Sequence, residues 1–164
     1  MAKIKHVILT EKNALPSTAF PTSLSNCTVN LSSITFNNHD MDGVILQAVI
    51  NWRATFTPND TTYALTTPGF ADVTFELLLN GQVVYRVSQT AMQKGIPLTG
   101  NFATATSTDE MTVLLHFDIP VRGNNTYTLQ ATNIVLTAPV LASGTATTSA
   151  AVGAVTFVVE EVVN

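Results

Sequence analysis

Residues 44–56 read Val-Ile-Leu-Gln-Ala-Val-Ile-Asn-Trp-Arg-Ala-Thr-Phe, with an apolar side chain at every even-numbered position. The residues between them are mixed and turn polar toward the end. A two-residue period sustained over this stretch predicts a β-strand with one face in a core. At about 3.3 Å per residue the strand would be ~43 Å long, so we expect it to bend or to carry a bulge. We interpret it as the central strand of an all-β domain.

The composition is unusual in its low charge. The chain has 164 residues, which suits one domain with a sizeable core. Hydrophobic residues make up 46 % and charged residues only 11 %, whereas a typical soluble domain has about 25 % charged residues. Two explanations remain open. The surface strands are rich in threonine, which suits exposed strand positions, or much of the surface is buried against other copies, because interface cores are depleted in charge.

The charge pattern and the apolar runs exclude several kinds of partner. The formal net charge is −4 and the basic residues form no stripe, so we expect no nucleic-acid partner. No segment approaches 18 apolar residues, so we expect no membrane span. The first apolar run is too short for a signal peptide, which predicts synthesis in the cytoplasm. Cys27 is the only cysteine and is expected to be a small buried apolar residue rather than part of a disulfide framework.

The N-terminus is predicted to be separate from the main domain. We assign residues 1–26 to an arm and linker and residues 27–164 to the domain. The arm holds a short β-like run followed by a stretch with two prolines. Three states stay open: an edge strand on the chain's own domain, a strand added to a neighbouring subunit, or disorder. The residues that we assign to assembly are Ile4, Val7 and Leu9.

The rest of the chain reads as strands joined by turns and long loops, without a convincing helix. Alternating or β-branched runs occupy residues 27–36, 73–87, 111–121, 127–136 and 154–163. In the first run, the parity of the apolar residues shifts between Leu31 and Ile34, which predicts a bulge at Ser32 and Ser33. This number of strands and the long connections predict an antiparallel two-sheet jelly-roll sandwich.

The clearest hairpin has Asn80-Gly81 between its two arms. A two-residue turn would place Phe75 opposite Arg86 and mix the two faces. A three-residue loop over residues 79–81 would instead pair Phe75 with Tyr85 and keep the apolar residues together. We therefore predict the three-residue loop.

Two groups of polar residues are candidates for chemistry. His116 and Asp118 lie two apart on one strand face, but no nucleophile or third ligand stands at readable spacing. We interpret them as a solvent-facing polar pair. Residues 39–43, His-Asp-Met-Asp-Gly, resemble part of a calcium loop but lack the full ligand series, so we interpret them as a polar turn. We expect no catalytic residues, no metal site and no cofactor.

From about Gly43 onward the chain resembles the C1q/TNF-like jelly-roll domains. More narrowly, it resembles the C-terminal domains of collagen-like glycoproteins on the outer layer of bacterial spores. The segments that carry the resemblance are 43–49 (GVILQAV), 76–84 (ELLLNGQVV), 121–129 (VRGNNTYTL) and 153–160 (GAVTFVVE). The sequence departs from that pattern because it has no Gly-X-Y tract and its first forty residues match nothing in the family. The resemblance implies a compact trimer packed through apolar strand faces, and it implies no catalysis.

We therefore expect a non-enzymatic structural protein that self-assembles, as a homotrimer or a filament, into a spore-surface or other extracellular structure. A sporulating mother cell coats its spore without a secretion signal, which fits the predicted cytoplasmic synthesis. The main partner would be the chain itself, with other spore-coat proteins or glycans as further candidates. The alternative is a carbohydrate- or receptor-binding jelly-roll module of a virion or phage tip.

Overall fold

The computed structural model describes residues 3–12, 18–21, 27–39, 42–59, 63–94, 101–102 and 104–163. The strands are β1 (Lys3–Lys12), β2 (Thr18–Ala19), β3 (Val29–Asn38), β4 (Gly43–Pro58), β5 (Tyr63–Thr67), β6 (Phe70–Leu79), β7 (Gln82–Met92), β8 (Asn101–Phe102), β9 (Thr106–Asp118), β10 (Gly123–Thr137), β11 (Val140–Leu141) and β12 (Ala146–Val163). Within the described ranges there is no helix long and apolar enough to cross a membrane.

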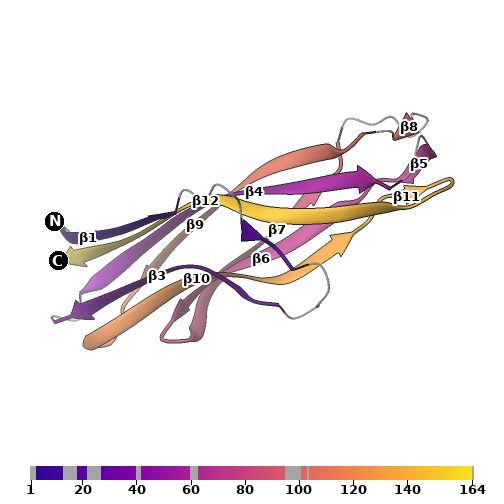
Figure 1. Cartoon of the computed structure of the whole chain (residues 1–164). Helices are drawn as coiled ribbons and strands as arrows, with labels where there is room; N and C mark the ends of the chain where they lie inside the picture. The colour runs from indigo at the N-terminus through magenta and orange to yellow at the C-terminus, as the bar shows by residue number, and fades with distance from the viewer. Residues whose placement is uncertain are drawn as a thin grey trace.

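The long strands form two antiparallel sheets that pack face to face (Figure 1). One sheet has the order β1-β12-β4-β9 and the other has the order β3-β10-β6-β7. Along the chain, successive long strands alternate between the two sheets, except for the β6–β7 hairpin. Two packed antiparallel sheets wound in this way form a jelly-roll sandwich. The predicted fold class is confirmed.

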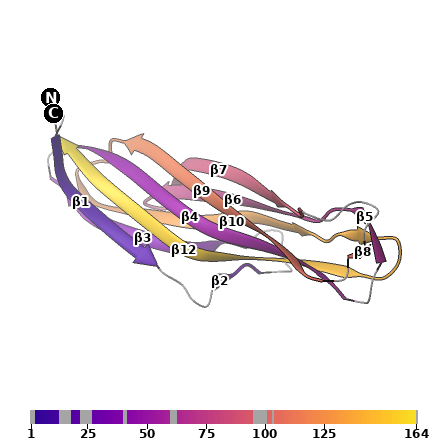
Figure 2. The same ribbon diagram turned by 90° about the horizontal axis from the view of Figure 1, so that it is seen from above.

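The two ends of the sandwich differ. Both chain termini lie side by side at one end, and β5 and β8 lie at the opposite end (Figure 2). There β5 pairs with β11 and with β8 in a small third sheet. The two residues of β2 pair with Ala151 and Val152 of β12. The short strands β5, β8 and β11 therefore lie together at the end away from the termini (Figure 1).

Strand β4 is central, as its alternating pattern predicts. Its even-numbered side chains from Val44 to Phe56 are all buried. The predicted bulge lies elsewhere: β4 pairs with β9 without a register shift, whereas β12 shifts against β4 between Val152 and Val155. The partner strand, rather than β4 itself, absorbs the irregularity of this long ladder.

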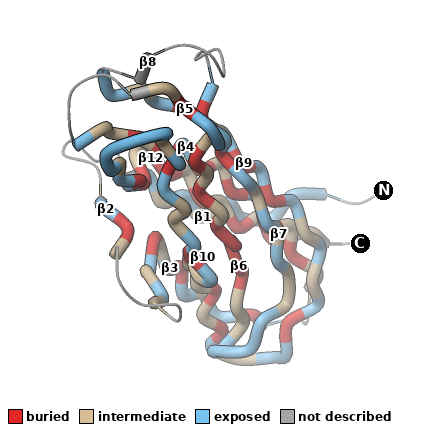
Figure 3. The backbone as a smooth tube through the Cα atoms, turned by 90° about the vertical axis from the view of Figure 1, so that its right-hand side faces the viewer, coloured by how far each residue is buried: buried red, intermediate tan, exposed pale blue. Residues whose placement is uncertain are grey.

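The core lies between the two sheets. Figure 3 shows buried positions alternating with half-buried and exposed ones along the strands. Trp52 of β4 meets Phe75 of β6 edge to face across the sandwich, with ring centroids 6.1 Å apart. Burial of such large aromatic rings is a main stabilising contribution in a sandwich of this size.

The predicted three-residue hairpin loop is wrong. Leu79 pairs with Gln82, so the turn has two residues, Asn80 and Gly81, both with positive φ (49° and 85°). These are the dihedrals of the tight turn that matches the twist of a hairpin. The mixing of faces is avoided by a bulge, because Leu78 pairs with Val83 but Leu77 pairs with Tyr85.

The parity shift in β3 does mark a bulge, although not at Ser32 and Ser33. Leu129 of β10 pairs with Ser32, and the next residue, Gln130, pairs with Asn30. The extra residue is therefore Leu31, one position before the predicted pair, and its side chain is buried. The bulge lets β3 bring both Leu31 and Ile34 into the core.

Candidate functional site: an apolar outer sheet face

The side of the β1-β12-β4-β9 sheet that faces away from the other sheet carries a set of exposed apolar side chains. On β1 and β9 these are Ile4, Val7, Leu9, Met111, Val113, Leu115 and Phe117. Between them lie half-buried apolar residues of β4 and β12, namely Ile45, Val49 and Val158. We call these residues the apolar face.

Strand register joins the members of the apolar face into rows, because residues paired across antiparallel strands share one side of the sheet. One row runs from Leu9 through Val158 and Gln47 to Leu115. The adjacent row consists of Val7, Glu160, Ile45 and Phe117. Gln47 and Glu160 are the polar members of these two rows. The next row, with Val49 and Val113, has Thr156 on β12 and the exposed Glu11 on β1, so the β9 edge is the more continuously apolar one.

The polar residues of β9 that were candidates for chemistry lie on the opposite side of the sheet from the apolar face. The pair His116 and Asp118 does not face solvent but lies on the inner side of the sheet. His116 stacks on Tyr85 of β7 with ring centroids 5.2 Å apart. Asp118 accepts a hydrogen bond of 2.7 Å from the Tyr127 hydroxyl. The solvent-facing interpretation of this pair is therefore wrong, and the odd-numbered apolar residues of β9 are the ones that point outward.

A buried polar network explains this orientation. Trp52 Nε1 donates to Thr112 Oγ1 at 3.2 Å, and the Thr112 hydroxyl donates to Gln89 of β7. Gln89 Nε2 in turn donates to Glu110 at 3.0 Å. A one-residue slip of β9 would turn Thr112 outward and remove its hydrogen bonds to Trp52 and Gln89, leaving the indole N–H only its longer contact of 3.4 Å with Gln89 Oε1. The network thus holds the apolar residues of β9 outward.

Tyr127 belongs to the same inner layer. Burial of its phenol, together with the hydrogen bond to Asp118, raises the pKa of Tyr127 well above its ordinary value of 10.0. Its ring stacks on Phe36 with centroids 6.0 Å apart. The phenol is therefore a protonated donor that ties β10 to the end of β9.

One aromatic ring of the apolar face depends on a glycine. A Cβ atom at Gly43 would come within 2.6 Å of the Phe117 ring on the paired strand. The ring therefore lies directly over the Gly43 backbone, which is possible only because no side chain stands there. This packing keeps Phe117 close to the sheet instead of projecting from it.

The outer side of the opposite sheet is polar. Cross-strand hydrogen bonds join Thr35 to Thr126 at 2.9 Å, Thr74 to Ser88 at 2.9 Å, and Gln130 to Glu76 at 2.9 Å. Such pairs suit strands that face water. This side also exposes Val83, Met92 and Val135. The sandwich therefore has one outer side that is largely polar and one that is largely apolar along its two edge strands.

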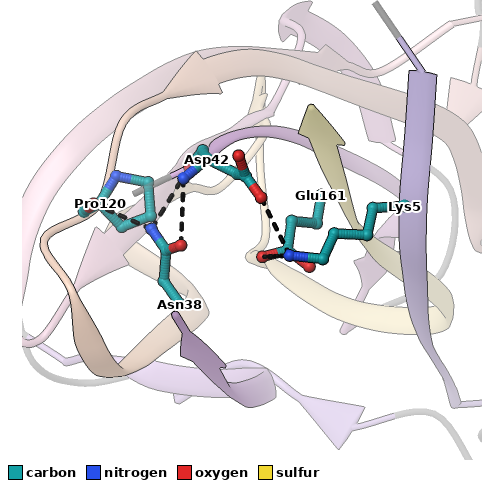
Figure 4. Close-up of polar contacts among 5 residues, drawn as sticks. All are labelled: Lys5, Asn38, Asp42, Pro120 and Glu161. Carbon is teal, nitrogen blue, oxygen red and sulfur yellow. Dashed lines mark hydrogen bonds and ion pairs between the residues drawn. The ribbon is translucent and has the colours of Figure 1, made fainter. Parts of the chain in front are cut away.

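Polar contacts at the end with the termini attach β1 to the sandwich (Figure 4). Lys5 Nζ lies 3.1 Å from the Asp42 carboxylate and 3.9 Å from that of Glu161. Asn38 is fully buried; its amide donates to the Pro120 carbonyl at 3.1 Å and its Oδ1 accepts from the Asp42 N–H at 3.1 Å. The Lys5 contacts join β1 to Glu161 of β12 and to Asp42, which precedes β4. The Asn38 contacts join the end of β3 to Asp42 and to Pro120, which follows β9.

The calcium-loop resemblance of residues 39–43 falls partly outside the described residues, because Asp40 and Met41 are not among them. Asp42 is described, and its carboxylate faces the Lys5 ammonium. Among the residues whose positions are given, no cluster of three or more His, Cys, Asp or Glu side chains could hold a metal ion.

A groove of about 630 Å³ lies on the same outer side, toward the end with the short strands β5, β8 and β11. Its lining includes Asn51, Arg53, Asp109, Met111, Ala151 and Gly153. Arg53 Nε and Nη2 donate to the two Asp109 carboxylate oxygens at 2.5 and 3.0 Å. This contact holds the pKa of Asp109 below its usual range. The small side chains of β12 make the groove, and the ion pair forms one wall.

The assembly residues predicted from sequence all lie on the apolar face. Ile4, Val7 and Leu9 are exposed on β1, which pairs with β12 of its own chain along nearly its whole length. Of the three states left open by the sequence, the structure has the edge strand on the chain's own domain. The role of these residues in assembly stays a prediction.

Sequence reasoning missed the β9 half of the face. Its alternating pattern was recognised, but alternation alone does not say which side points inward. A usable signal was the absence of charged residues between Met111 and Phe117. Cys27, expected to be buried, is a half-buried free thiol.

No protein-family model matches the chain, and no curated protein matches it. Solved structures align with it at low similarity. Dimeric latent PorU from Porphyromonas gingivalis has a TM-score of 0.38 at 9 % identity, covering 94 % of this chain and 12 % of that one. The infectious bursal disease virus Gt strain structure has a TM-score of 0.39 at 13 % identity, covering 98 % and 39 %.

A third similar structure is the CBM36-1 domain of a multidomain xylanase from the hindgut metagenome of Trinervitermes trinervoides. It has a TM-score of 0.29 at 11 % identity, covering 92 % of this chain and 96 % of that one. The chain spans less than half the length of the first two structures. Scores this low carry no argument about function, so the functional conclusion must come from the surface itself. The narrower resemblance to C1q/TNF-like domains stays a prediction.

Proposed function

We propose that this protein is a non-enzymatic structural module that assembles with copies of itself through the apolar face. The observation that carries the proposal is the difference between the two outer sides of the sandwich. One is covered by hydrogen-bonded Thr, Ser, Gln and Glu side chains. It also exposes Val83, Met92 and Val135. The other side exposes seven aliphatic and aromatic side chains on its two edge strands. Apolar surface of this kind is stabilised when it is removed from water.

The size of the apolar face suits one part of an interface. Its members span about seven residues on each of four strands spaced about 4.8 Å apart, which gives about 450 Å². Stable interfaces bury about 800 Å² on each partner, and the largest apolar patch on a typical monomer is roughly 300–600 Å². The face therefore has the size of the largest apolar patch on a monomer and supplies about half of a standard interface. The charged content of only 11 % is in keeping with such burial.

The form and place of the assembly follow from the sequence resemblance rather than from the geometry. A homotrimer and a filament are both consistent with packing through strand faces. The proposed location is the surface of a bacterial spore or another extracellular structure, where the chain would contact further copies, other coat proteins or glycans.

A matched pair of substitutions tests the proposal. Val7 lies on the apolar face and Val135 on the opposite sheet; each is 49 % exposed and each is paired with an acidic residue, Glu160 and Asp72 respectively. Val7→Glu should lower the particle mass measured by multi-angle light scattering, whereas Val135→Glu should leave it unchanged. Circular dichroism of both variants checks that the fold is intact.

A wild-type protein that stays monomeric at high concentration would contradict the proposed function. So would equal effects of the two substitutions, because assembly would then not depend on the apolar face.

The groove favours a second candidate, a carbohydrate-binding module. Asn51, Arg53 and Asp109 offer amide, guanidinium and carboxylate groups beside an open hollow, and such groups can hydrogen-bond sugar hydroxyls. A glycan array would test it. Reproducible binding that Asn51→Ala abolishes would favour this candidate, and an array without hits would count against it.

A further inference from the structure

Strand β9 forms an open edge of the sheet. Among the described residues it pairs with β4 alone, so the backbone groups on its other side have no strand partner. From Met111 to Phe117 it has no Asp, Glu, Lys or Arg, and its pairing with β4 has no register shift. A long, regular edge without charge is a template for another strand.

The opposite edge of the same sheet is built differently. Strand β1 has lysines at positions 3, 5 and 12 and shifts register between Ile4 and His6. Charged side chains and bulges are the usual features that prevent an edge from pairing with a further strand. Strand β9 has its charged residues, Asp109, Glu110 and Asp118, only on either side of this central stretch. The uncharged, regular centre of β9 is therefore the part of the sheet edge that we expect to be covered.

We propose that β9 pairs antiparallel with β9 of a second copy, about a two-fold axis at Val113, so that two sheets become one. The inference rests on the proposed self-assembly and adds a second contact to it. The joined sheet carries two apolar faces side by side. Edge pairing and packing of the faces together extend the assembly beyond a dimer.

The register follows from the positions of the side chains. Both apolar faces point to the same side only if outward residues pair with outward residues, which restricts the axis to a residue position. An axis at Leu114 would place Glu110 opposite Asp118 of the second copy, and like charges opposite each other are destabilising. An axis at Val113 places Glu110 opposite His116 and Met111 opposite Leu115.

The remaining nearby axis is less favourable. At Thr112 it would set Glu110 opposite the buried Leu114 of the second copy, so a carboxylate would face an apolar partner. The Thr112 axis would also set Asp109 opposite Leu115, so both carboxylates would face apolar residues. An axis at Val113 leaves only Asp109 opposite an apolar residue, Phe117, and Asp109 keeps Arg53 of its own chain as partner. Val113 is thus the centre with the fewest mismatched pairs.

The contact along β9 has a limited area. About 11 residues at roughly 3.4 Å each give a length of about 37 Å. One sheet with the side chains on its two sides is about 10 Å deep. The β9 edge therefore covers about 400 Å² on each copy, about half of the ~800 Å² of standard interfaces, and the backbone hydrogen bonds of the added strand contribute affinity beside this area.

Disulfide trapping tests the axis directly. At a two-fold axis Val113 lies opposite itself, with the Cα atoms about 4.5–5.5 Å apart, which is within the range that a disulfide spans. In a Cys27→Ser background, Val113→Cys should form a covalent dimer under mild oxidation. The control is Val7→Cys, an equally exposed valine on the other edge strand. We expect dimer formation at least about 10-fold faster for Val113→Cys, because the paired thiols are at high effective concentration.

Three outcomes would overturn the inference. They are equal rates for the two cysteine variants, no dimer with Val113→Cys, and a preferred mixed disulfide when the two variants are combined, which would indicate β9 against β1 of the next copy. If these occur while Val7→Glu still lowers the mass of the wild-type assembly, the edge contact is wrong and the proposed function stands. If the wild type is monomeric, both are wrong.

Discussion

Tyr127 shows at the scale of one residue how the inner layer of the sandwich is held together. Its phenol reaches from β10 to Asp118 at the end of β9, and its ring lies against Phe36 of β3. One side chain thereby joins both sheets near the end with the termini. The hydrogen bond also accounts for the inward direction of Asp118, which sequence reasoning placed in solvent.

The raised pKa of Tyr127 predicts how stability depends on pH. In the unfolded chain the phenol ionises near its ordinary pKa of 10.0, whereas the folded protein keeps its proton. The unfolded state therefore binds fewer protons above about pH 10, and the free energy of unfolding falls there by up to about 1.4 kcal/mol per pH unit. Below pH 10 the contribution is fully present.

Urea denaturation of the wild type and of Tyr127→Phe between pH 8 and pH 11 measures this contribution. Tyr127→Phe lacks the ionisable hydroxyl, so we expect it to be less stable than the wild type at pH 8. The difference in the free energy of unfolding between the two proteins should shrink as the pH rises above about 10, because only the wild type loses this contribution. A difference between the two proteins that stays constant over this range would contradict the assignment.

At the scale of the element, the β6–β7 hairpin shows how a turn and a bulge act together. Asn80 and Gly81 make a two-residue turn, and the shift after Leu77 restores the alternation of the arms. Asn80 is also fixed from outside the hairpin, because its Oδ1 accepts from the Thr126 N–H at 2.9 Å. The bulge therefore allows the Asn80-Gly81 turn to keep two residues while apolar side chains of both arms, such as Leu77 and Tyr85, still face the core.

Gly81→Ala tests the turn. A Cβ at this position would meet nothing within 4 Å, so the cost of the substitution comes from the backbone alone, whose φ is +85°. Left-handed conformations cost a non-glycine residue about 1–2 kcal/mol, and the free energy of unfolding should fall by about that amount. Gln82→Ala, at the neighbouring exposed position, should change it by less than about 0.5 kcal/mol. Equal effects would argue against the observed turn.

At the scale of the whole molecule, the sandwich has one largely polar outer side and one outer side with apolar edge strands. The buried network of Trp52, Thr112 and Gln89 turns the apolar residues of β9 outward, and the contacts of Lys5 hold β1 beside β12. The two edge strands thus place the apolar side chains on one surface. That surface supports the proposed assembly.

An assembly held by apolar contacts should respond to temperature and to the type of salt in a characteristic way. Hydrophobic association weakens on cooling and is strengthened by sulfate. The mass measured by light scattering should therefore fall between about 35 °C and about 5 °C and rise with added sodium sulfate. Dissociation by moderate sodium chloride would instead indicate charge pairs, whose attraction salt screens.

Several features were predictable from local sequence because they depend on neighbours along the chain. The alternation of residues 44–56 identifies β4 and its buried side. The even-numbered side is the buried one, because burial of the odd-numbered side would also bury Asn51 and Arg53. The position of the Asn80-Gly81 turn is equally local. The strand count and the connection lengths then suffice for a jelly-roll sandwich.

The direction of β9 and the place of β1 were decided only by the tertiary structure. In β9 both sides contain apolar residues, Leu114 on one and Val113 and Leu115 on the other, so a two-residue period leaves the inward side open. The choice depends on Trp52, Gln89 and Tyr127, which lie on other strands and supply the polar partners that Thr112 and Asp118 find only inside. Likewise, β1 is placed by its ladder to β12, more than 140 residues away in the chain. Hydrogen bonds between distant segments determine which apolar side chains are left at the surface, because a buried polar group without a partner costs more than an exposed apolar one.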